Sequence, residues 1–259
     1  MRFRELLQKL RARAGEKNRT CYLCRGEVFA GETFCKDCRG RLPYAVDFCL
    51  RCGRRTKERG FCAECRARLP LPDKERSAFV YDGEVRRLIY AFKNGDAGMA
   101  EGLAREMLPV LEREFAAADL LTFVPMTERA RRKRGYNQSE RLARALSALC
   151  GIPVEEIFAK TRETGEQKSL SRAEREKNLH GAFHLQKRAV CRGKKILLVD
   201  DVMTTGSTAD ELARLLRGAH AEKVWLLTLA ATPCPSPRPL DKGTDDTAEI
   251  DSEPMTNDE

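Results

Sequence analysis

Two adjacent carboxylates, Asp200 and Asp201, end a short apolar run and are followed at once by hydroxyl residues and a glycine. The run from Ile196 to Val199 is β-branched at both ends, which predicts a strand buried in a parallel sheet. The loop after it can present backbone N–H groups at a helix N-terminus, where phosphate binds. Because anions avoid carboxylates, this pairing indicates a ligand that also carries sugar hydroxyls or a magnesium ion.

A helix is predicted after this loop. Ser207 or Thr208 can cap it, and Leu212, Leu215 and Leu216 form an apolar face at helical spacing. An ordinary core strand followed by a capped helix is the alternative, but it leaves the two acids unexplained. The sequence has no G-x4-G-K-[ST] and no G-x-G-x-x-G, so nucleotide-binding classes lack their own motifs here.

A second anion-binding segment follows the predicted strand from Leu120 to Val124. Five of the six residues from 129 to 134 are basic, and Gly135 and a Leu- and Ala-rich helix come next. Its position after an apolar strand favours a phosphate-binding loop at the same edge of the sheet. A solvated basic loop or an RNA-binding arginine patch remains the alternative.

Eight of the eleven cysteines form four Cys-x2-Cys pairs, a spacing that lets both thiolates of a pair face one tetrahedral ion. We expect two structural Zn²⁺ sites with four cysteines each, and an interleaved use of the pairs stays open beside a sequential one. Disulfides and iron–sulfur ligation fit less well, since there is no export signal and the spacing differs from ferredoxins. In sequential use the sites are Cys21, Cys24, Cys35 and Cys38, then Cys49, Cys52, Cys62 and Cys65. The other three, Cys150, Cys191 and Cys234, are predicted to be core thiols.

Alternating strand and helix patterns begin near Ser77 and predict an α/β fold with a parallel sheet and right-handed crossovers, preceded by the cysteine-rich module. A polar segment from Thr161 to Leu179 reads as a mobile loop or a solvated surface helix. The predicted strands are 78–81, 120–124 and 196–199, with weaker ones near Ile157, near Phe183 and at 224–229, and the predicted helices include 99–116.

Charge is uneven along the 259 residues: residues 1–76 carry 20 Lys and Arg against 10 Asp and Glu. A basic front indicates nucleic acid or another polyanion, although a solvated surface explains it equally well. Residues 240–259 hold eight acids and one lysine, and the Pro-rich, acidic composition from Pro233 onward predicts disorder. No apolar run is long enough to span a membrane, and the N-terminus lacks a secretory core, so cytoplasmic residence is the default expectation.

The stretch from Ile196 to Thr208 resembles the 5-phosphoribosyl-1-pyrophosphate (PRPP) signature of type I phosphoribosyltransferases, and every position fits. The resemblance implies that Asp200 and Asp201 hold the ribose hydroxyls. It gives the rest of the ribose 5-phosphate site to Val202, Thr204, Thr205, Gly206, Ser207 and Thr208. In that family the basic loop binds pyrophosphate, here Arg132, Lys133, Arg134, Gly135, Tyr136 and Asn137. The two acids and Arg134 would be the catalytic residues, with Mg²⁺ bound together with PRPP.

The order of motifs is similar to the bacterial ComF family over about residues 19–231: cysteine pairs, Phe-Lys-Asn-Gly-Asp, Arg-Gly-Tyr-Asn-Gln, Gln-x-x-Leu-Ser-x-x-x-Arg-x-x-Asn-Leu-x-x-Ala-Phe, then the PRPP signature. This resemblance implies a loop that closes over the site, with candidates Lys93, Arg162, Gln167, Lys168, Arg172 and Arg175. The resemblance does not include the segment from Pro233 onward. Composition, patterning and the resemblance together predict a basic N-terminal helix (1–18), a double zinc ribbon (19–68), a linker (69–76), a phosphoribosyltransferase-like domain (77–232) and a disordered acidic tail (233–259).

ComF proteins are associated with natural competence and DNA uptake. The resemblance therefore implies a PRPP-binding protein that transfers a phosphoribosyl group to an unknown nitrogen acceptor, as a pentosyl-transferring glycosyltransferase. The alternative is a non-catalytic protein that senses PRPP or binds single-stranded DNA or a DNA-uptake helicase. The sequence names neither the acceptor nor the oligomeric state.

Overall fold

The computed structural model describes residues 20–29, 31–56, 60–67, 69–95, 97–163 and 178–234. The predicted N-terminal helix and nearly all of the predicted acidic tail lie outside them. The helices are α2 (Lys36–Arg41), α3 (Ala63–Ala67), α4 (Gly83–Lys93), α5 (Met99–Glu114), α6 (Glu128–Arg134), α7 (Gln138–Cys150), α9 (Arg188–Cys191) and α10 (Ser207–Gly218). The strands are β1 (Lys74–Val80), β2 (Leu120–Phe123), β3 (Phe158–Lys160), β4 (Phe183–Leu185), β5 (Lys195–Met203) and β6 (Lys223–Ala231).

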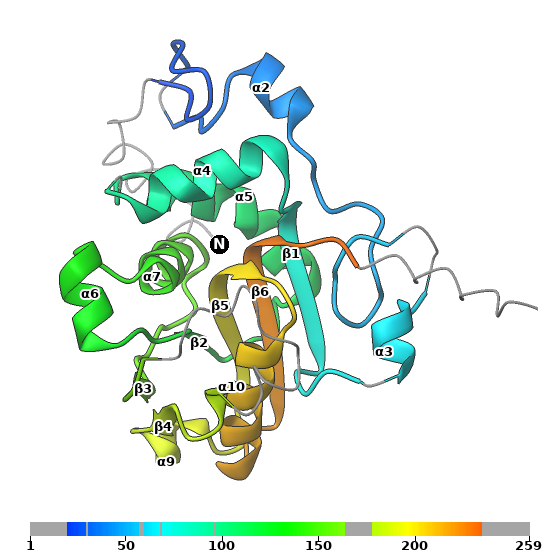
Figure 1. Cartoon of the computed structure of the whole chain (residues 1–259), viewed down its shortest axis with the longest axis vertical. Helices are drawn as coiled ribbons and strands as arrows, with labels where there is room; N and C mark the ends of the chain where they lie inside the picture. Colours follow the sequence, from blue (N-terminus) through cyan, green and yellow to red (C-terminus); the bar gives the residue numbers. More distant parts are fainter. Residues whose placement is uncertain are drawn as a thin grey trace, which may run out of the picture.

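A four-stranded parallel sheet in the order β1-β6-β5-β2 forms the centre of the fold, as predicted (Figure 1). Strand β1 begins at Lys74, inside the predicted linker, because its backbone pairs with β6 from that residue onward. Of the three weaker predicted strands, 224–229 belongs to β6 of this sheet, and the other two form a separate antiparallel pair, β3 and β4.

Both faces of the sheet are covered, which explains the unbroken apolar run in β5. Leu197 and Val199 are fully buried in a core shared with α4, α5 and α7. Ile196 and Leu198 are fully buried in a second core shared with α10 and the β3–β4 pair. The alternation along β5 therefore fixes the face on which each following side chain lies.

The cysteine-rich front end forms two lobes that dock at different places on the sheet domain. Ribbon 1 (residues 20–29 and 31–42) lies over α5, where Arg39 makes a bidentate ion pair with buried Glu106 at 2.9 Å and Tyr22 packs against Gly102. Ribbon 2 (residues 48–56 and 60–67) lies beside β1, with α3 on its outer side (Figure 1). Buried side chains of ribbon 1 belong to the same core as α4, α5 and α7, whereas the buried cysteines of ribbon 2 form a cluster of their own.

Two local predictions were wrong. The basic segment before Gly135 was predicted as a loop, but it forms the helix α6. The Thr127 side chain caps its first turn by accepting a hydrogen bond from the Ala130 N–H at 3.2 Å, which satisfies a donor that has no partner inside the helix. Helix α10 is preceded by Gly206 in the left-handed region (φ 79°), and neither Ser207 nor Thr208 caps it. The glycine makes the turn, and no side chain caps the first N–H groups of the helix.

None of the helices in the described parts of the chain is long and apolar enough to cross a bilayer.

Candidate PRPP and zinc sites

The acidic pair lies near the end of β5 and still within it, because the strand continues to Met203 instead of ending at Val199. Lys93, from the end of α4, forms an ion pair with Asp201 at 2.7 Å. Ser139, in the first turn of α7, donates a hydrogen bond to Asp200 at 2.7 Å. Three segments that are distant in the sequence therefore meet at the carboxyl end of the central strand.

Electrostatics separates the two acids. Burial, and then the neighbouring charge of Asp201, raise the pKa of Asp200 to about 7. Burial opposes the charged form of Lys93, but the Asp201 carboxylate more than compensates, and the pKa of Lys93 lies above its usual range. The acidic pair thus combines a Lys93–Asp201 ion pair with the Asp200 carboxyl, whose pKa is raised to about 7.

The residues predicted to bind the 5-phosphate form a compact turn between β5 and α10. Thr205 Oγ1 and Ser207 Oγ lie 3.0 Å apart, and the turn encloses a cavity of about 30 Å³. Asp200, Val202, Thr204, Gly206 and Thr208 also line that cavity. Because the turn precedes a three-turn helix, its N–H groups lie at the positive end of a dipole, as an anion site requires.

The predicted pyrophosphate segment divides into exposed and buried residues. Arg132, Lys133 and Arg134 are exposed on α6, and Arg134 donates to Gln138 at 2.9 Å. Gly135 ends the helix in the left-handed region. Tyr136 is buried and donates to the Phe92 carbonyl oxygen.

Asn137 connects this turn to the acidic pair. Its side-chain oxygen accepts from the Ser139 N–H at 3.0 Å and so begins α7, while its amide donates to the Val124 carbonyl at 3.0 Å. The hydroxyl of Ser139 is thereby aimed at Asp200. The Arg-Gly-Tyr-Asn-Gln motif thus forms the turn between α6 and α7 as well as supplying a positively charged side chain.

Of the predicted flexible-loop residues, Lys93 belongs to α4, and Arg162 donates to the His180 carbonyl at 2.9 Å across the base of the polar segment. The remaining candidates Gln167, Lys168, Arg172 and Arg175 lie outside the described residues.

The cysteine pairs form two separate groups among the described residues, and the pairs are used in sequence order. Within each group the sulfur atoms all lie within 4.8 Å of one another. Four thiolates at about 2.3 Å from a tetrahedral Zn²⁺ are about 3.8 Å apart, and the Cys24–Cys35 and Cys52–Cys62 sulfur distances are 3.8 Å. Both donor sets therefore fit zinc.

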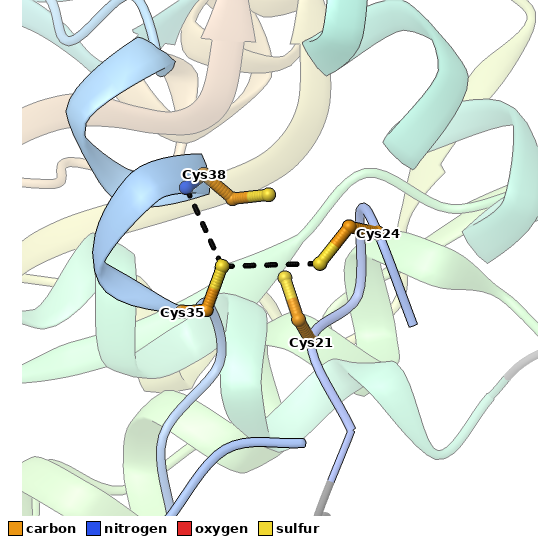
Figure 2. Close-up of side chains that lie close together, drawn as sticks. All are labelled: Cys21, Cys24, Cys35 and Cys38. Carbon is orange, nitrogen blue, oxygen red and sulfur yellow. Dashed lines mark hydrogen bonds between the residues drawn. The ribbon is translucent and has the colours of Figure 1, made fainter. Parts of the chain in front are cut away.

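Figure 2 shows the first group: Cys21 and Cys24 lie on a loop, and Cys35 and Cys38 lie at the start of α2. The Cys38 N–H points to Cys35 Sγ at 3.5 Å, and in the second group the Cys62 N–H points to Cys49 Sγ at 3.3 Å. Backbone donors aimed at sulfur stabilise thiolate ligands, as expected for metal knuckles.

Comparison with known proteins agrees with both halves of the chain. A double zinc ribbon domain model matches residues 18–69, and a phosphoribosyl transferase domain model matches residues 132–253. The DNA utilization protein YhgH of Escherichia coli K12 is 32% identical over 218 residues, which cover 80% of this chain and 95% of that protein. The chain belongs to the ComF family.

Competence protein F of Haemophilus influenzae is 29% identical to this ComF-family chain over 225 residues, covering 83% of the chain and 91% of that protein. Among solved structures, a glutamine PRPP amidotransferase from B. subtilis is 27% identical with a TM-score of 0.35, covering 50% of the chain and 26% of that structure.

Sequence reasoning missed two residues of the ComF-chain site. Ser139 directly follows the Arg-Gly-Tyr-Asn-Gln motif, and its hydroxyl contacts Asp200. Its position two residues after Asn137, which caps the helix, is the sequence signal that could have identified it. Lys160 ends β3, where burial lowers its pKa although Glu163 and Asp200 oppose that shift. Lys160 lines a cavity of about 190 Å³ together with Arg131 and Asn137, and no sequence motif indicates this role for Lys160.

Cys234 corrects another prediction. It is half-buried, packs against the second cysteine group and donates its N–H to the Arg55 carbonyl at 2.9 Å, so it is not a thiol of the sheet domain's core. The strand β6 leads the chain back past ribbon 2, which no local pattern in the sequence could indicate. Cys191 is buried in the second core, as predicted.

Proposed function

We propose that this ComF-family chain binds PRPP, with the ribose hydroxyls on Asp200 and Asp201 and the 5-phosphate on the turn from Thr204 to Thr208. The observation that carries the proposal is the convergence of Lys93 and Ser139 on the two acids, directly before a helix N-terminus. A carboxylate pair accepts hydrogen bonds from vicinal hydroxyls, whereas the turn donates them to a phosphate.

The reaction that this arrangement supports is phosphoribosyl transfer. A nitrogen nucleophile would form a bond to C1 of the ribose while the C1–O bond to pyrophosphate breaks, and the pyrophosphate leaves with the bonding electrons. Arg132, Lys133 and Arg134 would stabilise the charge that develops on the leaving group. Mg²⁺, held by PRPP oxygens and the acidic pair, would neutralise part of the same charge.

Lys93 would have to release Asp201 when the ligand binds. Its ammonium group lies 2.7 Å from that carboxylate and is partly exposed, so it can turn to a phosphate oxygen without leaving the site. The cavity beside Lys160 is lined by Glu128 and Arg131 of the basic helix, and we propose it as the place of the acceptor or of the departing pyrophosphate.

Thermal unfolding with and without ligand tests the binding proposal. PRPP with Mg²⁺ should raise the melting temperature of the wild-type protein more than ribose 5-phosphate or inorganic phosphate does, because only PRPP occupies both anion sites. The Asp200→Asn/Asp201→Asn variant should lose the shift, and an equal shift in both proteins would remove the assignment.

Transfer is tested separately. Wild-type protein incubated with ribose-labelled PRPP, Mg²⁺ and pooled bases and amines should release pyrophosphate and form a labelled product. Binding without any product at saturating Mg²⁺ would leave a PRPP-binding protein and contradict the transferase.

Single-stranded DNA binding is a second candidate, favoured by exposed aromatic side chains on both ribbons. Phe29 is 83% exposed and Phe61 is 49% exposed, and bases stack on such rings beside arginines. The names of the relatives refer to DNA utilization and competence. Affinity for single-stranded DNA should fall with salt, fall in Phe29→Ala and Phe61→Ala, and survive the acidic-pair substitutions.

A further inference from the structure

Ribbon 2 contacts the proposed phosphate turn directly through Arg54. The side chain of Arg54 is only 5% exposed, and its Nη1 donates to the Thr204 carbonyl at 2.9 Å. Its Nη2 is ion-paired with Glu64, next to the ligand Cys65. The backbone carbonyl of Arg54 accepts a hydrogen bond from the Cys49 N–H at 2.9 Å. Arg54 therefore closes the metal knuckle with its backbone and reaches the turn with its side chain.

The end of β6 holds the turn from the same side. Thr232 donates its N–H to the Met203 carbonyl at 2.9 Å and its hydroxyl to the Thr204 carbonyl at 3.2 Å. Two residues later, Cys234 lies against the second cysteine group. The Thr204 carbonyl therefore has two donors, both from elements that contact the metal site.

Ribbon 2 and the turn leave almost no space between them. The cavity that separates Cys52 and Cys65 from Thr205 and Gly206 measures about 10 Å³, about the volume that one water centre needs. On the other side, a side chain at Gly53 would lie 2.3 Å from the Glu75 carbonyl of β1. Ribbon 2 is in contact with the turn on one side and with β1 on the other, so a movement of ribbon 2 must displace at least one of them.

We propose that the second zinc site and PRPP binding are thermodynamically coupled, and that Arg54 is the positioning residue that carries the coupling. The inference rests on the proposed PRPP site. An ordered ribbon 2 fixes the Thr204 carbonyl and thereby pre-organises the N–H groups of the turn toward the phosphate. Because linkage is reciprocal, bound PRPP must in turn stabilise the second metal site.

Ribbon 1 provides the matched control. Arg39 is also an arginine of a cysteine lobe that reaches a partner on the sheet domain, in this case Glu106 of α5. Among the contacts described for Arg39, none involves the phosphate turn. Arg39→Lys and Arg54→Lys both keep the positive charge and remove the planar guanidinium with its two sets of donors. The two substitutions differ only in the lobe affected and in the partner of the arginine.

Affinity for PRPP with Mg²⁺ is measured by calorimetry on full-length protein, with zinc content checked for each variant. Arg54→Lys should bind PRPP about tenfold more weakly than wild type, and Arg39→Lys should bind within about twofold of it. Equal affinity of Arg54→Lys and wild type would overturn the coupling, as would an equal loss in both variants.

The reciprocal measurement needs no substitution. Zinc transfer from wild-type protein to a chromogenic zinc-selective chelator is followed with and without PRPP and Mg²⁺, and PRPP should slow the release of one of two equivalents. The Asp200→Asn/Asp201→Asn variant controls for zinc binding by PRPP itself. Wild type that binds PRPP yet releases both equivalents at unchanged rates refutes the coupling alone, whereas wild type that does not bind PRPP refutes the proposed function and the coupling with it.

Discussion

At the scale of single residues, the two carboxyl groups of the acidic pair repel each other when both are charged. Asp200 lies beside a second carboxylate, is largely desolvated, and its pKa is raised to about 7. Lys93 neutralises Asp201 and Ser139 supports Asp200, but these contacts do not remove the repulsion. In the proposed PRPP site, hydrogen-bond donors or a cation from the ligand would offset this repulsion.

The raised pKa of Asp200 predicts a pH dependence of stability. An unfolded Asp has a pKa of about 3.9, so the folded protein holds this proton more tightly. The contribution of Asp200 to the free energy of unfolding should therefore fall as pH rises from about 4 to about 7, and then stay constant. Asp200→Asn should remove this decline and be more stable than wild type at pH 8, by up to about 4 kcal/mol.

Denaturant titrations of both proteins across that pH range measure the effect. Unfolding free energies that run parallel from pH 4 to 8 would contradict the assigned pKa. The same Asp200→Asn variant should lose the PRPP-induced thermal shift, which separates its effect on stability from its effect on binding.

At the scale of elements, the docking of ribbon 2 on β1 depends on Gly53. Its φ is 65°, and the Glu75 carbonyl occupies the place of a side chain. Gly31 in ribbon 1 has a φ of 89°, but no atom lies within 4 Å of the place that a methyl group would take there. An alanine at either position would strain the backbone, but only an alanine at Gly53 would also clash with neighbouring atoms. Comparing the two substitutions therefore separates the effect of backbone strain from that of the clash.

Gly53→Ala should therefore lower the free energy of unfolding by more than about 2 kcal/mol, and Gly31→Ala by only about 1 kcal/mol. Denaturant unfolding with zinc quantified before each titration checks both values. Equal losses would show that ribbon 2 is not packed against β1 as closely as described.

The elements themselves were largely predictable, since apolar runs and helical spacing identify β2, β5, β6 and α5. Their ends were less so. Strand β5 continues through the acids because β6 pairs with it as far as Met203, and pairing partners are not visible in a single segment. The basic residues of α6 look like a loop, since they have no apolar face, and the helix is set by Thr127 and Gly135 at its two ends.

At the scale of the whole molecule, the two cysteine lobes serve different parts of the sheet domain. Ribbon 1 is tied to α5 through Arg39 and Glu106, which are 67 residues apart in the sequence, and ribbon 2 is tied to the phosphate turn through Arg54, 150 residues away. Spacing predicted the ligand sets, but it could not predict these long-range contacts. The same holds for Lys93 at Asp201 and for Cys234 at ribbon 2.

Metal analysis tests this division. Wild type should contain about two Zn²⁺ per chain, and Cys24→Ser and Cys52→Ser should each contain about one. Only Cys52→Ser should also weaken PRPP binding, because its lobe contacts the turn. A wild-type value near one, or equal PRPP affinities in the two variants, would contradict the separate roles of the ribbons.

The most direct test of the central claim is a calorimetric titration of PRPP with Mg²⁺ into wild type and into Asp200→Asn/Asp201→Asn. If the acids hold the ribose, wild type binds one PRPP per chain and the variant binds at least about 100-fold more weakly, since two charge-assisted contacts are lost. Equal affinities in the two folded, zinc-loaded proteins would contradict the assignment of the PRPP site.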